Sequence, residues 1–184
     1  MTDPAPQPAS VYDLSHADQE ESRATFAVLV DNEPGVLHRV VGLFAARGYN
    51  IDSLTVAETD GQAHTSRITI VTRGTVQVLG QIEAQLQKMV STRHVQDVTR
   101  DPNGLERELA LVKVRGTGVE RVEALRVADI FRAKVVDTTH ESFVFEITGA
   151  SSKVDKFVGL MRPLGLVEVS RTGVLSLQRG VEVF

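Results

Sequence analysis

Residues 31–37, with the sequence DNEPGVL, join an apolar run at residues 25–30 to an amphipathic run at residues 36–46. The first run, TFAVLV, is typical of a buried strand, and the second spaces its apolar residues as an amphipathic helix does. Pro34 fits the first position of a helix, where its missing N–H costs nothing, and it disfavours helical geometry at Glu33. The junction therefore predicts a strand, a tight turn and a helix that begins at Pro34, and we expect the fold to be built around it.

The start of this helix is also a candidate binding site. The backbone N–H groups of Gly35, Val36 and Leu37 have no acceptor inside the helix, and they lie at the positive end of its dipole. Gly35 adds no side chain that would hinder an approaching ligand. Such a turn can bind a carboxylate or a phosphate. The same Pro-Gly sequence equally suits a turn that binds nothing, and the spacing alone leaves both interpretations open.

Asn50 extends the candidate site. It is the first residue of the next strand pattern, and in the expected fold this strand begins close to the start of the first helix. Asn32 and Asn50 would then offer side-chain carbonyls for an ammonium group, beside the helix N–H groups that suit a carboxylate. An α-amino acid carries both groups. With Val36, Leu37 and Ile51 as an apolar lining, the site would suit an amino acid with a small branched side chain.

The chain repeats one pattern twice. Strand and helix patterns follow in the order strand–helix–strand–strand–helix–strand between residues 25 and 100, and again between residues 109 and 170. This order is the split βαβ, or ferredoxin-like, plan. We therefore expect an α+β protein made of two tandem ferredoxin-like βαββαβ domains, each too small to bury a large core alone.

We expect four segments along the chain. The turn-forming sequence DPNG favours a linker at residues 101–106, between domains at residues 23–100 and 107–184. Residues 1–22 are rich in proline and polar residues. Such a segment buries too little apolar surface to offset its ordering entropy, so we expect a disordered N-terminal extension there.

The composition excludes several functional classes. The 184 residues carry a formal charge of −4 and contain no cysteine. The charge gives no sign of a nucleic-acid-binding surface, and the missing thiols exclude disulfides and thiolate zinc sites. No apolar run approaches the ~18 residues of a transmembrane helix, and residues 1–21 lack the pattern of a signal peptide. We expect a cytoplasmic protein with no membrane or nucleic-acid partner.

The sequence also lacks a convincing catalytic or metal site. Its five histidines are scattered, without the spacing of a metal motif, and no nucleophile–base pair stands out. Residues 116–118, GTG, follow a strand pattern, but Arg121 occupies the third glycine position of a dinucleotide fingerprint. We expect no catalytic residue, no metal ligand and no cofactor in this chain.

Several stretches together resemble a known family. They are NEPGVL at residues 32–37, RGYNIDSLTV at residues 47–56, SRITI at residues 66–70, ELALVKV at residues 108–114 and VEVSRTGV at residues 167–174. The first two are similar to the ACT domain, and all five are similar to the small, regulatory subunit of acetohydroxyacid synthase, also called acetolactate synthase. The resemblance extends over residues 23–180 and identifies the N-terminal domain as the ACT domain.

The resemblance implies a regulatory subunit that is not itself an enzyme. Members of the family activate a separate catalytic (large) subunit, which carries thiamine diphosphate, Mg2+ and usually FAD and condenses pyruvate with pyruvate or 2-oxobutyrate. They also confer feedback inhibition by valine on the biosynthesis of the branched-chain amino acids valine, leucine and isoleucine. The same role is expected of this chain.

The resemblance also implies where the effector binds. In the family, the ACT domains of a homodimer pair side by side, and the effector lies between a loop of one copy and a strand of the other. The positions that match this valine site are Asn32, Gly35, Val36 and Leu37 in the loop, and Asn50 and Ile51 in the strand. The second domain has RGTG at residues 115–118 in place of NEPG, so we expect it to serve dimerisation or contact with the catalytic subunit.

Two other functions stay open from the sequence. A tandem ACT sensor could regulate a different enzyme or a transcription factor, and the partner that co-purifies with the chain would distinguish it from the first function. A small stand-alone enzyme would show turnover by the isolated chain.

Overall fold

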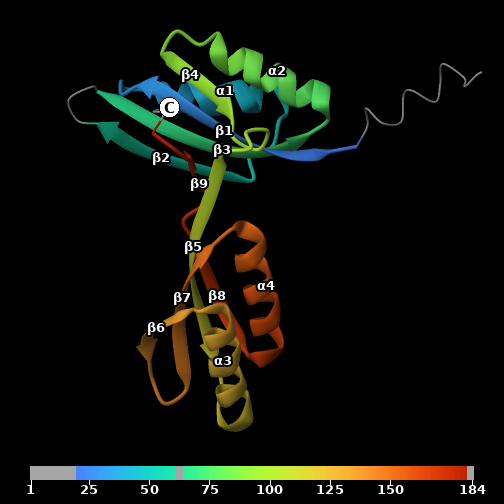
Figure 1. Ribbon diagram of the computed structural model, residues 1–184, viewed down its shortest axis with the longest axis vertical. Coiled ribbons are helices and arrows are strands. Elements are labelled where there is room, and N and C mark those ends of the chain that lie inside the picture. The colour runs from blue at the N-terminus through green and yellow to red at the C-terminus, as the bar shows by residue number, and fades with distance from the viewer. Residues whose placement is uncertain (1–19, 61–63, 182–184) are drawn as a thin grey trace, which may run out of the picture.

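The computed structural model describes residues 20–60 and 64–181, which form two layered units (Figure 1). Each unit combines an antiparallel sheet with two α-helices, and strand β5 (Gly104–Arg115) runs from one unit into the other. Most of the extension expected at residues 1–22 lies outside the described residues. Its last residue, Ser22, belongs to strand β1 (Ser22–Asp31), because it pairs with Gly74.

The N-terminal unit follows the ferredoxin-like plan. Its elements are β1, α1 (Val36–Arg47), β2 (Ser53–Asp60), β3 (Thr65–Gly74), α2 (Val76–Gln87) and β4 (Thr92–Asp97). The strands lie in the order β2-β3-β1-β4, and neighbouring strands are antiparallel. This order places β2 and β4 at the two edges of the sheet.

Both helices of this unit cover the same face of the sheet (Figure 1). Val36, Val40 and Phe44 follow one another at intervals of one turn along α1. They are buried in one cluster with Phe26 and Val28 of β1. The apolar residues that recur with helical spacing in the sequence are therefore the ones that pack α1 on the sheet.

The C-terminal unit repeats the plan. After β5 come α3 (Gly118–Phe131), β6 (Lys134–Thr138), β7 (Ser142–Gly149), α4 (Ser151–Met161), the short 3-10 helix η3 (Arg162–Leu164), β8 (Leu166–Arg171) and β9 (Leu175–Gln178). Its strand order is β6-β7-β5-β8. Phe145 of β7 and Phe157 of α4 meet edge to face in its core, with ring centroids 6.1 Å apart. The predicted α+β fold with two tandem βαββαβ patterns is confirmed.

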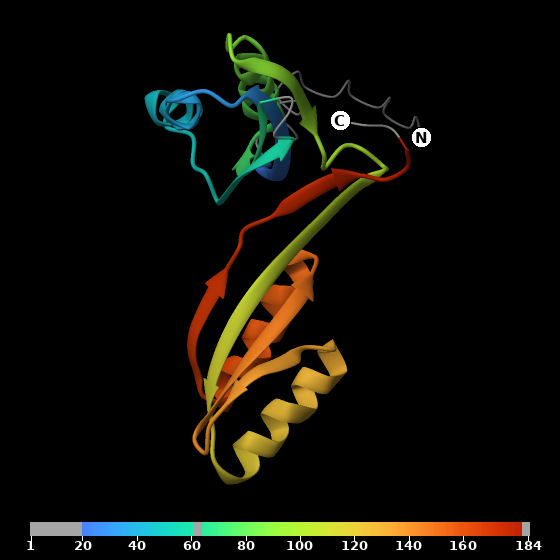
Figure 2. The same cartoon turned by 90° about the vertical axis from the view of Figure 1, so that its left-hand side faces the viewer.

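The first residues of β5 pair with β9 rather than with the rest of the second sheet. Residues 104–106, expected in the linker, are therefore strand, because they pair with residues 176–178. This two-stranded ribbon lies under the face of the first sheet that α1 and α2 leave open (Figure 2). There the Nη1 atom of Arg67 donates to the carbonyl oxygen of Ser176 at 2.9 Å. Strand β9 thus packs on the N-terminal unit.

Candidate effector-binding site

The turn between β1 and α1 is fixed by its own backbone. Gly35 caps α1 with φ +84°, a left-handed conformation that glycine adopts without strain. The N–H of Val36 donates to the carbonyl oxygen of Glu33 at 3.2 Å. The helix therefore begins at Val36, where the apolar spacing begins, and not at Pro34, because the left-handed Gly35 intervenes. The N–H of Val36 has no acceptor inside the helix, as expected, but Glu33 in the preceding turn occupies it.

The rest of the turn is open to solvent. Asn32, Gly35 and Leu37 are exposed, and within the described residues no acceptor is found for the N–H of Gly35 or Leu37. These two N–H groups, at the positive end of the α1 dipole, suit an anion. The N–H of Asn32 donates to the carbonyl oxygen of His64 at 2.7 Å, which holds the turn beside the start of β3.

A cation that the sequence patterns did not reveal lies beside this turn. A side-chain carbon on Gly35 would sit 3.9 Å from the Nη1 atom of Arg39. Arg39 also forms an ion pair with Glu33 and donates to the hydroxyl of Ser91 at 3.3 Å. Residues one helical turn apart share a face, but an exposed arginine at that spacing carries no motif. The guanidinium of Arg39 therefore lies close to a candidate carboxylate site, with its charge balanced by Glu33.

Asn50 and Ile51 lie in the loop before β2. The strand begins at Ser53, so the expected strand start at Asn50 is wrong. The Nδ2 atom of Asn50 donates to Asp52 at 2.8 Å, and its backbone carbonyl accepts from the hydroxyl of Thr72 at 2.6 Å. These bonds turn the backbone before it joins the sheet. Asn50 is held in place while remaining exposed, and Ile51 is half-buried against the core.

The two halves of the predicted site lie at opposite ends of α1. Gly35 precedes the helix, and Asn50 follows Gly48, which caps its other end. At about 1.5 Å per residue, this helix of 12 residues is ~18 Å long. The structure therefore brings the four loop residues together but does not bring Asn50 and Ile51 beside them within one chain. The expectation that the second strand begins near the start of the helix is wrong, because the helix carries the chain to its far end.

An exposed apolar strip runs between these two ends. Leu37 and Val41 of α1 and Val56 of β2 are 39%, 36% and 42% exposed. Arg47 on α1 donates to Gln85 of α2, so Leu37 and Val41, on the other side of the helix, face the β2 edge of the unit. In the described part of the chain, no strand pairs with the outer side of β2. We call the surface formed by Leu37, Val41 and Val56 the β2 flank.

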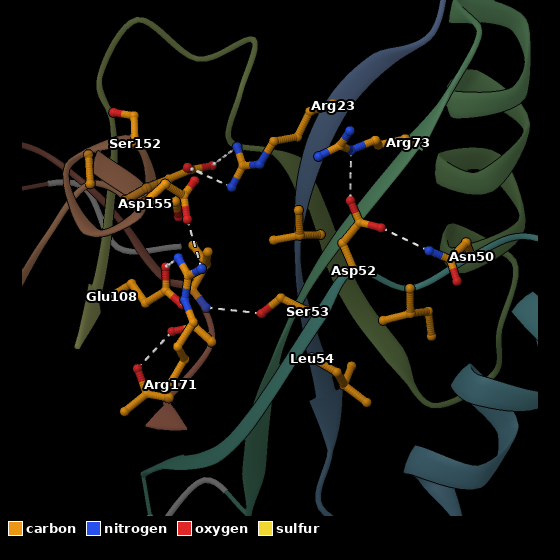
Figure 3. Close-up of a pocket in the computed structure, with 18 residues that line it drawn as sticks. Arg23, Asn50, Asp52, Ser53, Leu54, Arg73, Glu108, Ser152, Asp155 and Arg171 are labelled. Atoms are coloured by element: carbon orange, nitrogen blue, oxygen red, sulfur yellow. Dashed lines mark hydrogen bonds and ion pairs between the residues drawn. The ribbon is translucent and has the colours of Figure 1, made fainter. Parts of the chain in front are cut away.

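A cavity of about 1070 Å³ opens between the two units (Figure 3). On one wall, Arg171 donates to both oxygens of Glu108 and to Asp155, each at 2.7 Å. Glu108 is buried, and its hydrogen bond raises the pKa of Arg171 above the ordinary value. On the other wall, Arg73 donates to Asp52 at 2.9 Å. The charged side chains of the cavity therefore hold one another.

The described helices are too short or too polar to cross a membrane. Across residues 20–60 and 64–181, no three acidic or histidine side chains come together as metal ligands would. The polar groups at the candidate site are backbone amides, carboxamides and paired charges.

Both units match known proteins. Residues 26–94 match the family described as "AHAS small subunit-like ACT domain", and residues 107–180 match "Small subunit of acetolactate synthase". A probable acetolactate synthase small subunit from Archaeoglobus fulgidus is 45% identical over 85% of this chain and 96% of its own length. The chain belongs to the acetolactate synthase small-subunit family.

Other members of the family are similar over the same length. The acetolactate synthase isozyme 3 small subunit of Escherichia coli (strain K12) is 43% identical over 88% of this chain and 98% of its own. The crystal structure of the acetolactate synthase small subunit from Thermotoga maritima has a TM-score of 0.76 and 38% identity, covering 88% of this chain and 99% of that one. The predicted family is confirmed, and the N-terminal unit is its ACT domain.

Proposed function

We propose that this chain is the regulatory subunit of an acetolactate synthase. It activates the catalytic subunit, binds valine between two ACT domains and confers valine feedback inhibition on the complex. The supporting observation is the placement of two half-sites at opposite ends of α1, with the β2 flank between them. The first half-site is Asn32, Gly35, Val36 and Leu37, and the second is Asn50 and Ile51. Within one copy the two half-sites do not meet.

A two-fold homodimer would complete the site twice. When two copies pair along their β2 flanks, their α1 helices run antiparallel, so Gly35 of one copy approaches Asn50 of the other. The pairing would join the two β2 edges into one continuous sheet and bury Leu37, Val41 and Val56. Each end of the symmetric interface would then hold one effector.

The polar groups of the completed site suit an α-amino acid. The N–H groups of Gly35 and Leu37, with the guanidinium of Arg39 nearby, would bind its carboxylate. The side-chain carbonyls of Asn32 and Asn50 would accept hydrogen bonds from its ammonium group. Charge-assisted hydrogen bonds contribute about 1.5–3 kcal/mol each before ordering costs, which is enough for an effector site.

The apolar groups would select a small branched side chain. Leu37 is exposed and Ile51 is half-buried, so both can contact a ligand at the interface. Val36 is 6% exposed, and it would support the turn from inside the core instead of lining the ligand over a wide area. Valine fits these contacts with little additional space.

The catalytic chemistry would belong to the partner. We assign thiamine diphosphate, Mg2+ and FAD to the large catalytic subunit, which makes acetolactate for the biosynthesis of valine, leucine and isoleucine. This chain would act in the cytoplasm by allostery. Valine would shift the complex between two states because it binds one of them more tightly.

Calorimetric titration of valine into the purified chain tests the site. We expect Asn32→Ala to weaken binding about tenfold, which corresponds to the loss of one hydrogen bond of ~1.4 kcal/mol. Gly35→Asp should abolish binding, because its carboxylate repels that of the ligand. Gly180→Asp is the matched control, since Gly180 also has positive φ and no atom within 4 Å of an added side-chain carbon. Undiminished binding by both loop variants would overturn the site assignment.

Reconstitution with the catalytic subunit tests the partner. We expect the chain to raise the rate of acetolactate formation and valine to reverse that effect. A sensor for a different enzyme or for a transcription factor would co-purify with that protein instead and would leave acetolactate formation unchanged.

A further inference from the structure

A short segment of the C-terminal unit is tied to the strand that follows the second half-site. Residues 172–176, which we call the strap, comprise the link between β8 and β9 and the first two residues of β9. They cross the first sheet on the face opposite its helices (Figure 2). The N–H of Val174 donates to the hydroxyl oxygen of Ser53 at 3.1 Å, and the hydroxyl of Thr55 donates to the carbonyl oxygen of Thr172 at 3.4 Å. The strap therefore contacts β2 directly after the loop that carries the second half-site.

A side chain at Gly173 would displace the hydroxyl groups that make this contact. Gly173 has φ +81°, and a side-chain carbon there would lie 2.6 Å from the hydroxyl oxygen of Ser53 and 2.8 Å from that of Thr55. Two further residues of the strap, Val174 and Ser176, are 3% and 7% exposed. Val174 and Ser176 therefore fix the strap against the sheet, while Thr172 and Leu175 face solvent.

The other end of the strap is anchored in the C-terminal unit. Arg171, the residue before it, holds Glu108 of β5 through two bonds and Asp155 of α4 through a third, all of 2.7 Å (Figure 3). The N–H of Thr172 donates to the carbonyl oxygen of Leu109 at 3.0 Å. A movement of the strap would therefore move β8 and α4 with it.

The loop before β2 connects the strap to the candidate effector site. Asn50 donates to Asp52 at 2.8 Å, and Asp52 accepts from Arg73 of β3 at 2.9 Å (Figure 3). The N–H of Asp52 donates to the carbonyl oxygen of Val71 at 2.8 Å. These bonds make the loop and Ser53 one rigid piece, so a ligand that shifts Asn50 also shifts the hydroxyl that accepts from the strap.

The cavity beside the strap is lined by ion pairs and lies between the two units. Arg23 of β1 pairs with Glu106 of the ribbon at 3.0 Å, and Arg171 pairs with Glu108 of the same strand β5 at 2.7 Å. Within each pair the two charges balance, so the cavity offers little to a charged ligand. Because the walls come from both units, the shape of the cavity changes whenever one unit moves against the other.

We propose that the strap carries the valine signal from the ACT dimer to the C-terminal unit by moving with Ser53 and Thr55. This inference rests on the proposed function, since it gives a route for regulation from the same site. Valine favours one of two strap positions, and the C-terminal unit presents a different surface to the catalytic subunit in each. A strap detached from β2 leaves valine binding intact and uncouples it from inhibition.

Gly173→Ala separates binding from coupling. We expect this variant to bind valine within about threefold of wild type, while the valine concentration for half-inhibition of the reconstituted synthase rises by about tenfold or more. Gly180→Ala is the matched control, because it puts alanine at another glycine of positive φ where an added carbon meets no atom within 4 Å. It should leave both measurements unchanged.

Ser53→Ala tests the same contact without a collision. It removes the acceptor of the Val174 N–H and adds no atom, so it should weaken the coupling between valine binding and inhibition. This variant still tests the contact when Gly173→Ala is too unstable to assay. Amide hydrogen exchange at Val174 is an independent measurement. In wild type, valine should change the exchange rate of this amide, and in Gly173→Ala it should not.

The outcomes separate the two proposals. When wild type binds no valine, the proposed function is overturned and this inference with it. When wild type binds valine but the exchange of the Val174 amide does not respond, the strap is not the route and the proposed function stands. The same conclusion follows when Gly173→Ala binds valine and keeps the wild-type inhibition curve.

Discussion

Among single residues, Glu108 forms a buried two-bond contact in the C-terminal unit. It is 4% exposed and accepts two 2.7 Å bonds from Arg171. Glu108→Ala leaves Arg171 without these bonds, but water replaces part of them because the arginine side chain is 36% exposed. We expect the free energy of unfolding to fall by about 1–3 kcal/mol, measured by urea denaturation. Glu168→Ala, which removes an exposed partner of Lys113, should lower it far less, because water screens an exposed ion pair.

The exposed pair of Lys113 and Glu168 gives a prediction about pH. The hydrogen bond from Lys113 lowers the pKa of Glu168 below its ordinary value. Because the folded-state pKa is lowered, this pair stabilises the protein above the ordinary pKa of glutamate, and the effect is lost as pH falls through the lowered value. In Lys113→Ala, the pKa of Glu168 should rise toward its ordinary value in a 13C NMR titration. An unchanged titration curve would contradict the contact.

The types of residue in the candidate site were predictable from the sequence, but their positions relative to one another were not. Gly35 and Asn50 can be identified from the sequence, because the conformation of a Pro-Gly turn and the hydrogen-bonding groups of an asparagine depend only on local residues. The left-handed conformation of Gly35 is not visible in the spacing of residues. Arg39 could not be identified either, because an exposed arginine one helical turn away carries no motif. Asn50 was expected beside the first turn of α1, whereas the length of the helix places it at the other end.

Among the elements, α1 and β2 form the β2 flank on which the proposed dimer depends. Val56 is 42% exposed on an edge strand, so a charge there would be buried without a partner in the dimer. We expect Val56→Lys to raise the dimer dissociation constant by about tenfold or more in analytical ultracentrifugation. Val90→Lys makes the same change at a fully exposed position away from the flank. A dimer unaffected by Val56→Lys would place the interface elsewhere.

Most elements were predictable because their buried residues recur with one period. The stripe on α1 is an example, since its apolar residues are the ones that meet the sheet. The strand β9 lies beyond residue 170, where the predicted second repeat ends. There the buried residues are Val174 and Ser176, whereas Leu175 and Leu177 are 52% and 59% exposed. A pattern of apolar residues cannot identify a strand whose leucines face outward and whose buried residues include a serine.

In the whole molecule, the strap and β9 support a unit far from them in sequence. Val174 is 3% exposed against the first sheet, and the hydroxyl of Ser176 lies 3.5 Å from that of Thr69. A chain that ends at Thr172 should therefore lose about 2 kcal/mol of stability or more, since burial of one valine side chain alone contributes about 1.5–3 kcal/mol.

Differential scanning calorimetry of two truncated chains measures this contribution. The chain that ends at Thr172 lacks most of the strap and all of β9, whereas a control chain that ends at Gln178 retains both. We expect the unfolding transition of the ACT domain to move to lower temperature only in the shorter chain, because only there does the open face of its sheet become exposed to water. Equal melting of the two truncated chains would mean that the ribbon rests on the sheet without stabilising it. In that case the strap could not hold two units in register, and the signal between them would have to pass through β5.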